Sequence, residues 1–258
     1  MNIFKSFFKK IFRPIYNFYF KLLKFSNLKY LDNLFTLNNT PFLNDKFLEI
    51  YNKSVENTIK KTIDPKFYFR MHQLIWAFET IKSQKKNFSI VELGTGKGLM
   101  MYGLSQVIKK NPKRNTKIFM FDTFLPYKTN KTTGEQKIGS KESPFYSDSY
   151  EQVKETFKRF NFVNIKKGKC PQILFDNIKD FQNMPIGVLH VDMNYHKAEI
   201  DSIDFLYKFF AEVCIIVLDD YANLGRDEQA FFHEKYFKSK NLSILTTASG
   251  QGIVICIK

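Results

Sequence analysis

The chain has 258 residues, of which 44% are hydrophobic, and it carries a formal net charge of +15. This hydrophobic fraction is enough for a buried core and excludes a chain that is disordered throughout. The three cysteines are far apart and match no zinc-ligand spacing, and no secretory signal is visible, so we expect a cytoplasmic protein. One α/β domain with an appended segment accounts for the length.

The first 31 residues hold a dense cluster of positive charge. Seven Lys or Arg side chains occur there before the first acid, Asp32. Aromatic and aliphatic residues recur at steps of three and four, which is the pattern of a basic amphipathic helix bent near Pro14. The longest uncharged run, Pro14 to Phe20, is too short to span a bilayer. Two roles stay open for this arm: peripheral contact with an anionic membrane, or packing on the body or on a second subunit.

Positive charge outside the arm is spread thinly along the chain. No zinc-finger, RNP or helix-turn-helix signature accompanies it, so we interpret most lysines as solvated and expect no nucleic-acid partner. Residues 32–65 are rich in Asn and predict loops and short helices. The predicted organisation is a helical N-terminal extension over residues 1–65 and a second domain over residues 66–258.

Helices and strands are predicted to alternate from residue 66 onward. The hydrophobic periodicity predicts helices at 69–81, 99–109, 149–160, 171–180, 197–211 and 227–237. Strands are predicted at 88–93, 117–122, 161–167, 186–192, 213–219, 242–247 and 252–257. A long polar loop covers 123–148, and the last two strands are close enough for a hairpin. This order predicts a doubly wound, Rossmann-like α/β fold with a seven-stranded sheet whose last strand is antiparallel.

A glycine-rich turn follows the first of these strands and opens a helix. Glycines at alternate positions let the backbone turn tightly and let a ligand approach it closely. The spacing G-x-G-x-G is one residue tighter than the dinucleotide fingerprint, which favours S-adenosylmethionine (SAM) over NAD. Asp122 ends the next strand, where a carboxylate can accept both ribose hydroxyls; a structural turn and a loop cap are the alternative interpretations. The candidate cofactor residues are Glu92, Gly94, Thr95, Gly96, Gly98 and Asp122.

Three acidic residues follow two further strands of the predicted sheet. Asp192 ends one strand, and Asp219 and Asp220 end the next. Because the carboxyl ends of neighbouring strands meet at the ligand crevice, we expect these side chains to converge. Three unpaired carboxylates would repel one another, and a hard cation such as Mg²⁺ would relieve that repulsion. Capping of the following loops is the alternative for any single aspartate.

At these residues the chain resembles the macrocin-type O-methyltransferases, metal-dependent enzymes that methylate sugar hydroxyls. The resemblance covers about Phe67 to the C-terminus. It rests on the glycine turn, Phe121-Asp122-Thr123-Phe124, Leu189-His190-Val191-Asp192 followed by Tyr195, and Val217-Leu218-Asp219-Asp220-Tyr221. It implies that Glu92 to Gly98 and Asp122 hold SAM, that the three aspartates bind Mg²⁺, and that the chain forms a dimer or larger homo-oligomer.

One position departs from the family pattern Asp-x-Asp-x-Tyr, in which the second Asp looks like the general base. This chain has Asn194 there, and an amide cannot remove a proton. The candidate catalytic residues are therefore Asp192 and His196, since a histidine with a reference pKa of about 6.5 suits proton abstraction. His196 is equally interpreted as an exposed neighbour of a helix cap. Alternatively, the acceptor oxygen is already anionic and needs no base.

The sequence thus predicts a SAM-dependent and Mg²⁺-dependent O-methyltransferase. Its acceptor would be a small molecule or glycan that presents a sugar hydroxyl or an anionic phosphoryl or phosphoramidate group, with a role in surface or capsular glycan modification. The loop 123–148 is interpreted as a lid or as a solvated loop. Two alternatives remain: a nucleic-acid methyltransferase, suggested by the basic charge, and a non-catalytic SAM-binding protein at the membrane. We expect a cytoplasmic location, peripheral at the inner membrane face if the arm binds lipid.

Overall fold

The computed structural model describes residues 29–32, 34–36, 40–59, 64–83, 87–110, 115–125, 127–129, 136–138, 149–223 and 225–258. Residues 1–28 of the predicted amphipathic arm and most of the predicted loop at 123–148 lie outside these ranges. Among the helices within them, none combines the length and the apolar character that crossing a membrane requires.

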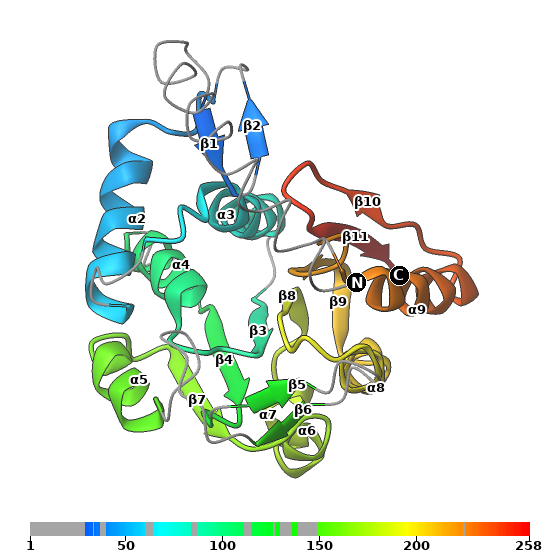
Figure 1. The fold of residues 1–258 in the computed structure, drawn as a ribbon. Coiled ribbons are helices and arrows are strands. Elements are labelled where there is room, and N and C mark those ends of the chain that lie inside the picture. Colours follow the sequence, from blue (N-terminus) through cyan, green and yellow to red (C-terminus); the bar gives the residue numbers. More distant parts are fainter. Residues whose placement is uncertain are drawn as a thin grey trace.

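A seven-stranded mixed sheet forms the centre of the fold (Figure 1). In spatial order its strands are β10 (Leu245–Thr246), β11 (Gly252–Ile257), β9 (Phe210–Leu218), β8 (Ile186–Val191), β3 (Ser89–Leu93), β4 (Lys117–Asp122) and β7 (Val163–Lys167). The strands from β9 to β7 are parallel, and β11 is antiparallel to both of its neighbours. The predicted doubly wound sheet with an antiparallel last strand is confirmed. The order in which the chain adds strands reverses at β3: β4 and β7 lie on one side of it, and β8 and β9 lie on the other. Ligands bind at this switch point in such sheets.

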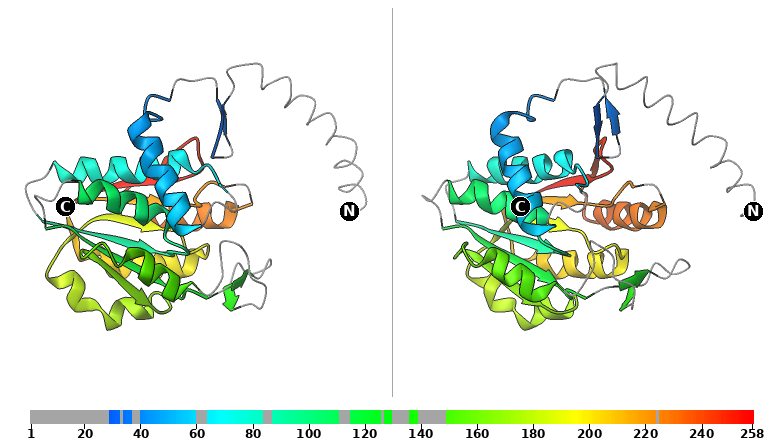
Figure 2. Two further views of the ribbon diagram at one scale, coloured as in Figure 1. Left: turned by 90° about the vertical axis from the view of Figure 1, so that its left-hand side faces the viewer. Right: turned by 60° about the vertical axis from the view of Figure 1, so that its left-hand side comes forward.

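Helices cover both faces of this sheet (Figure 2). One hydrophobic cluster joins the sheet to α2 (Asp45–Thr58), α3 (Tyr68–Lys82), α4 (Leu99–Lys109) and α5 (Tyr150–Phe157). The other joins it to α6 (Gln172–Asp176), α7 (Ile178–Gln182), α8 (His196–Tyr207) and α9 (Asp227–Ser239). Successive strand residues face opposite clusters, as Ile90 and Val91 do, because side chains alternate along a strand.

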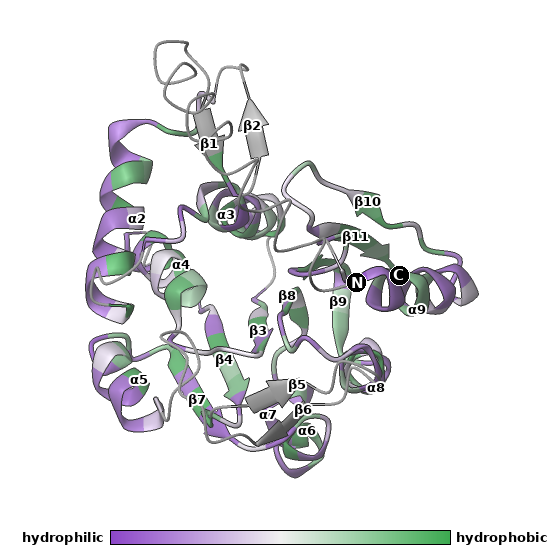
Figure 3. Ribbon diagram, viewed as in Figure 1, coloured by the Kyte–Doolittle hydropathy of each residue, from purple (hydrophilic) through white to green (hydrophobic). Residues whose placement is uncertain are grey.

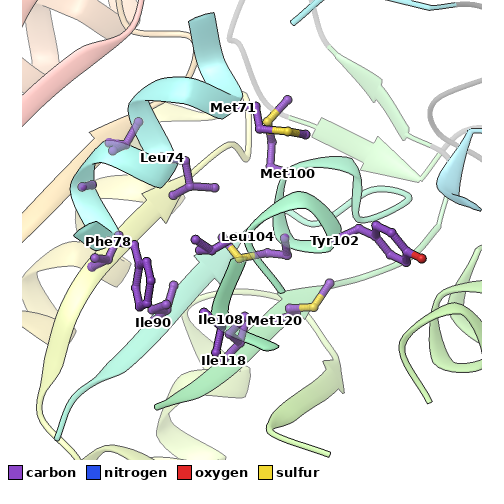
Figure 4. Packing of buried hydrophobic residues seen from close by; sticks show 14 of the residues in the cluster. Met71, Leu74, Phe78, Ile90, Met100, Tyr102, Leu104, Ile108, Ile118 and Met120 are labelled. Atoms are coloured by element: carbon purple, nitrogen blue, oxygen red, sulfur yellow. The ribbon is translucent and has the colours of Figure 1, made fainter. Parts of the chain in front are cut away.

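The first cluster is built from closely packed aliphatic, aromatic and methionine side chains (Figure 4). It includes Met71, Leu74 and Phe78 of α3, Met100, Tyr102, Leu104 and Ile108 of α4, and Ile90, Ile118 and Met120 of the strands. On the outside, the helices carry hydrophilic residues beside hydrophobic ones (Figure 3), as expected for elements that pack one face on a core.

Helix α2 is longer and more regular than the loops and short helices predicted for residues 32–65. Asn44 caps it by accepting a hydrogen bond from the Phe47 backbone N–H at 3.0 Å. Phe47, Ile50, Tyr51 and Val55 lie on one buried face and share the core with α3 and α4. Residues 45–58 therefore pack as part of the body, while the division at residues 65 and 66 stays a prediction.

Three further segments differ from the sequence prediction. The helix predicted at 171–180 is divided at Asn177 into α6 and α7. A short antiparallel pair, β5 (Tyr127–Thr129) and β6 (Gln136–Ile138), lies within the predicted loop at 123–148. A second pair, β1 (Lys29–Leu31) and β2 (Leu34–Thr36), precedes α2.

Candidate active site

A cavity of about 820 Å³ lies at the carboxyl ends of the central strands. This volume is within the range typical of ligand sites. Of the predicted site residues, the cavity is lined by Glu92, Gly94, Thr95, Gly96, Asp122, Asp192 and Asp219. The predicted cofactor turn and part of the predicted metal site therefore open into one space, as the strand order requires.

The glycine turn packs directly against the loop that follows β8. Gly94 has φ of +86°, and a Cβ atom there would lie 2.0 Å from the backbone oxygen of Asp192. Gly98 has φ of +81°, and a Cβ there would lie 2.6 Å from the Phe157 ring. Only glycine fits such positions, because an L side chain would meet both backbone strain and neighbouring atoms. The turn is thus a cradle of bare backbone with the space and polar groups that a cofactor needs.

Asp122 organises this turn from the end of β4. Its Oδ2 accepts hydrogen bonds from the backbone N–H groups of Thr95 and Gly96, both at 2.7 Å. Its Oδ1 accepts one from the Phe124 N–H at 2.6 Å. The carboxylate expected to contact a ribose therefore also fixes the shape of the glycine turn.

A buried pair of titratable side chains lies beneath the turn. His190 Nδ1 is 3.1 Å from Glu92 Oε1, and both residues are almost fully buried. Burial raises the pKa of the Glu92 carboxyl well above its usual value. Burial, reinforced by the Arg70 guanidinium, lowers the pKa of His190 to about 3. His190 is therefore uncharged at neutral pH and adds no positive charge beside the aspartates.

The three aspartates predicted to bind a metal do converge. Asp192, Asp219 and Asp220 each offer one carboxylate oxygen, and these oxygens lie within 4.8 Å of one another. Burial raises the pKa of Asp192 well above its usual value, and the charge of Asp220 raises it further. Such a set of hard oxygen donors fits a divalent cation such as Mg²⁺.

Arg70, which the sequence analysis did not single out, reaches this acidic site from the first turn of α3. Only 6% of the residue is exposed, and its Cζ lies 4.6 Å from the centre of the Phe67 ring. Its Nη1 contacts Asp219 Oδ2 and lies 3.6 Å from Asp220 Oδ1. Its Nε lies 3.9 Å from Oδ1 of the buried Asp32. In the sequence, the only sign that Arg70 belongs to a site is that it is a charged residue between apolar ones, which by itself is weak.

The buried carboxyl of Asp32 gives a test by pH. Burial raises its pKa to about 6, although hydrogen bonds from Phe69 and Arg70 and the Arg70 charge oppose the shift. Its contribution to stability is therefore fully present below the unfolded value of 3.8 and is lost as the pH rises through about 6. Relative to Asp32→Asn, wild type should lose about 2 kcal/mol between about pH 4 and about pH 7. Denaturant unfolding in chelator at both pH values measures this, and an unchanged difference would contradict it.

Asn194, the position that departs from the family pattern, is buried with φ of +60°. Its Oδ1 accepts a hydrogen bond from Arg226 Nη2, which also lies 3.3 Å from Asp220 Oδ2. The structure does not bring His196 to the cavity: it begins α8, and its ring stacks on Phe232 with centroids 4.3 Å apart. Among the described residues, its neighbour Tyr195 lines the cavity and His196 does not.

The sheet order, the glycine turn after β3 and the cavity at the point where the strand order reverses define a class I SAM-dependent methyltransferase. The family model of the macrocin O-methyltransferases (TylF) matches residues 68–244. The chain belongs to this family and is a SAM-dependent O-methyltransferase.

Solved structures with the same fold include two O-methyltransferases. NovP is 14% identical, with 80% of this chain and 88% of that chain covered and a TM-score of 0.58. The calicheamicin methyltransferase CalS11 is 9% identical, with 84% and 94% covered and a TM-score of 0.58. At these identities the likeness shows the fold alone. No curated protein matches the sequence.

Proposed function

We propose that this enzyme is Mg²⁺-dependent and methylates an oxygen of a small polar acceptor held beside the acidic site. The observation that carries the proposal is the packing of Gly94 against the backbone of Asp192. This contact brings the cofactor turn beside Asp192, which lines the same cavity as Asp219 and converges with Asp219 and Asp220. A donor held by the turn and an acceptor held by the aspartates would then be neighbours, which is the orientation that methyl transfer requires.

The chemistry of the lining residues indicates which of them would hold the cofactor and which the cation. Glu92 to Gly98 and Asp122 would hold SAM, which supplies an activated methyl group when bound. Asp192, Asp219 and Asp220 would hold Mg²⁺, which supplies a positive charge that orients and polarises an acceptor oxygen. Apolar residues such as Leu99, Phe121 and Phe124 line the same cavity and exclude water from it.

The acceptor is proposed to be a sugar hydroxyl or an anionic phosphoryl or phosphoramidate oxygen. CalS11 is described as a TDP-rhamnose 3'-O-methyltransferase, which supports a sugar. Lys97, Lys169 and Lys197 line the cavity, which supports an acceptor that carries negative charge. With Asn194 unable to remove a proton, an anionic acceptor oxygen would be methylated without a base. Glycan modification, a homo-oligomer and membrane contact through the arm stay predictions.

The test follows S-adenosylhomocysteine release from SAM with a panel of nucleotide sugars, phosphorylated glycans and small phosphoryl compounds. We expect turnover with one acceptor class, loss of that turnover in excess EDTA, and recovery on adding Mg²⁺ beyond the chelator. Because the cation is needed to place the acceptor, the loss should exceed about 100-fold. Full turnover in EDTA would reject the metal role. Turnover only with RNA or DNA would reject the small acceptor.

A further inference from the structure

Arg70 lies between two separate acidic partners in the buried part of the site. On one side its Nη1 contacts Asp219 and lies 3.6 Å from Asp220. On the other side its Nε points toward Asp32, with 3.9 Å between Nε and Oδ1. Nε has no hydrogen-bond partner among the described residues, although it is buried. The guanidinium therefore makes a close ion pair with Asp219 and only a long contact with Asp32.

The contact with Asp219 occupies an oxygen that a cation would need. Asp219 Oδ1 already accepts a hydrogen bond from Gln251 Nε2 at 2.6 Å, and His190 Nε2 lies 3.6 Å from the same oxygen. The remaining oxygen, Oδ2, is the one that Arg70 holds. A guanidinium and a divalent cation compete for this oxygen, because both are positive and the cation binds carboxylate oxygens at short range.

Asp32 offers Arg70 a second ion-pair partner whose carboxylate is already held in position. Its Oδ2 is fixed by the Phe69 backbone N–H, which leaves Oδ1 toward the guanidinium. Asp32 is 3% exposed, so a full ion pair there would keep the charge of Arg70 compensated inside the protein. A small movement of the guanidinium is enough, since the two groups are already 3.9 Å apart.

We propose that Arg70 is a displaceable counter-cation of the acidic site. When a divalent cation enters between Asp192, Asp219 and Asp220, Arg70 leaves Asp219 and completes its ion pair with Asp32. Asp32 lies between β1 and β2, so cation binding is coupled to the stability of residues 29–32 and 34–36. This inference rests on the proposed cation site and adds a residue that controls its affinity.

The first experiment measures Mn²⁺ binding to the full chain by electron paramagnetic resonance, without SAM or acceptor. Arg70→Met removes the competitor and should tighten Mn²⁺ binding about tenfold or more. Asp32→Asn removes the alternative partner and should weaken it about fivefold. In the Arg70→Met background, Asp32→Asn should change the affinity by less than about twofold, because no guanidinium is left to place.

Arg226→Met is the matched control, since Arg226 also lies beside Asp220. If Arg70 acted only through its charge, the two arginine variants would behave alike. We expect instead that Asp32→Asn still weakens Mn²⁺ binding about fivefold in the Arg226→Met background. An equal effect of Asp32→Asn with and without Arg70 would overturn the proposal.

A second measurement needs no variant of Arg70. Hydrogen exchange of the amides in residues 29–32 and 34–36 should slow when Mg²⁺ is added to wild type, and it should not slow in Asp32→Asn. Absence of this change in wild type would also overturn the proposal. If neither wild type nor Arg70→Met binds Mn²⁺, the cation site itself is rejected. If wild type binds Mn²⁺ but the Arg70 and Asp32 effects are additive, only the displacement is rejected.

Discussion

Replacing Gly94 with alanine is expected to lower the free energy of unfolding by about 3 kcal/mol and to abolish measurable SAM binding. The positive φ of +86° alone costs an L residue about 1 to 2 kcal/mol. The new methyl group would also lie 2.0 Å from the Asp192 carbonyl oxygen, so the backbone of the turn must move. Since that backbone is the proposed cradle for SAM, the movement should remove the binding site.

Gly225 gives a matched control for this substitution. It has nearly the same φ, +85°, but a Cβ there would meet nothing within 4 Å. Gly225→Ala should therefore cost only the backbone strain, about 1 kcal/mol, and leave binding of S-adenosylhomocysteine unchanged. Denaturant unfolding and calorimetric titration measure both effects. Equal losses of stability in the two variants, with binding retained in Gly94→Ala, would show that the close packing is not required.

Replacing Asp219 with asparagine should weaken Mn²⁺ binding at least about 100-fold and lower stability by about 2 kcal/mol. The first effect follows because an amide replaces a charged ligand of the proposed cation site. The second follows because the buried Arg70 loses its contact with Asp219, a loss that Asp220 and Asp32 offset only in part. Binding of S-adenosylhomocysteine should change little, since the glycine turn and Asp122 are untouched.

Two further variants separate these effects. Combining Asp219→Asn with Arg70→Met should restore part of the stability without restoring Mn²⁺ binding, because the guanidinium that lost a partner is gone but the cation ligand is still missing. Asp201→Asn, which alters another carboxylate on the cavity wall, should leave Mn²⁺ affinity unchanged. Tight Mn²⁺ binding by Asp219→Asn would place the cation elsewhere.

Local patterns in the sequence were sufficient to predict most of the second domain. The helix at 99–109 and the strand at 117–122 occur with the bounds predicted. The helix is amphipathic and the strand is a short apolar run, and both are bordered by glycine or polar residues that end an element. Helix α2 was predicted only as loops and short helices, because the Asn-rich sequence around it obscured the helical spacing of Phe47, Ile50, Tyr51 and Val55. Its stability comes from packing more than from local preference.

The candidate site was predictable where it follows from sheet topology. Asp192, Asp219 and Asp220 follow neighbouring parallel strands, so their convergence could be inferred from residue order. Arg70 and Asp32 could not be inferred in this way. Their contacts join residues 149 and 37 positions apart in the chain, and no periodicity or spacing encodes them. The stacking of His196 on Phe232 likewise depends on how α8 and α9 pack.

The position of α2 indicates how much of the chain is needed for this enzyme to fold by itself. The family match begins at residue 68, after α2 has ended. Yet this helix closes one side of the packing around Met71 and Tyr102, and residues preceding it supply Asp32 to Arg70. A chain shortened to the matched segment would expose that apolar surface to water and would leave Arg70 without Asp32, one of its three carboxylate partners. We therefore expect the smallest fragment that folds by itself to include α2 and Asp32, which precede the segment matched by the family model.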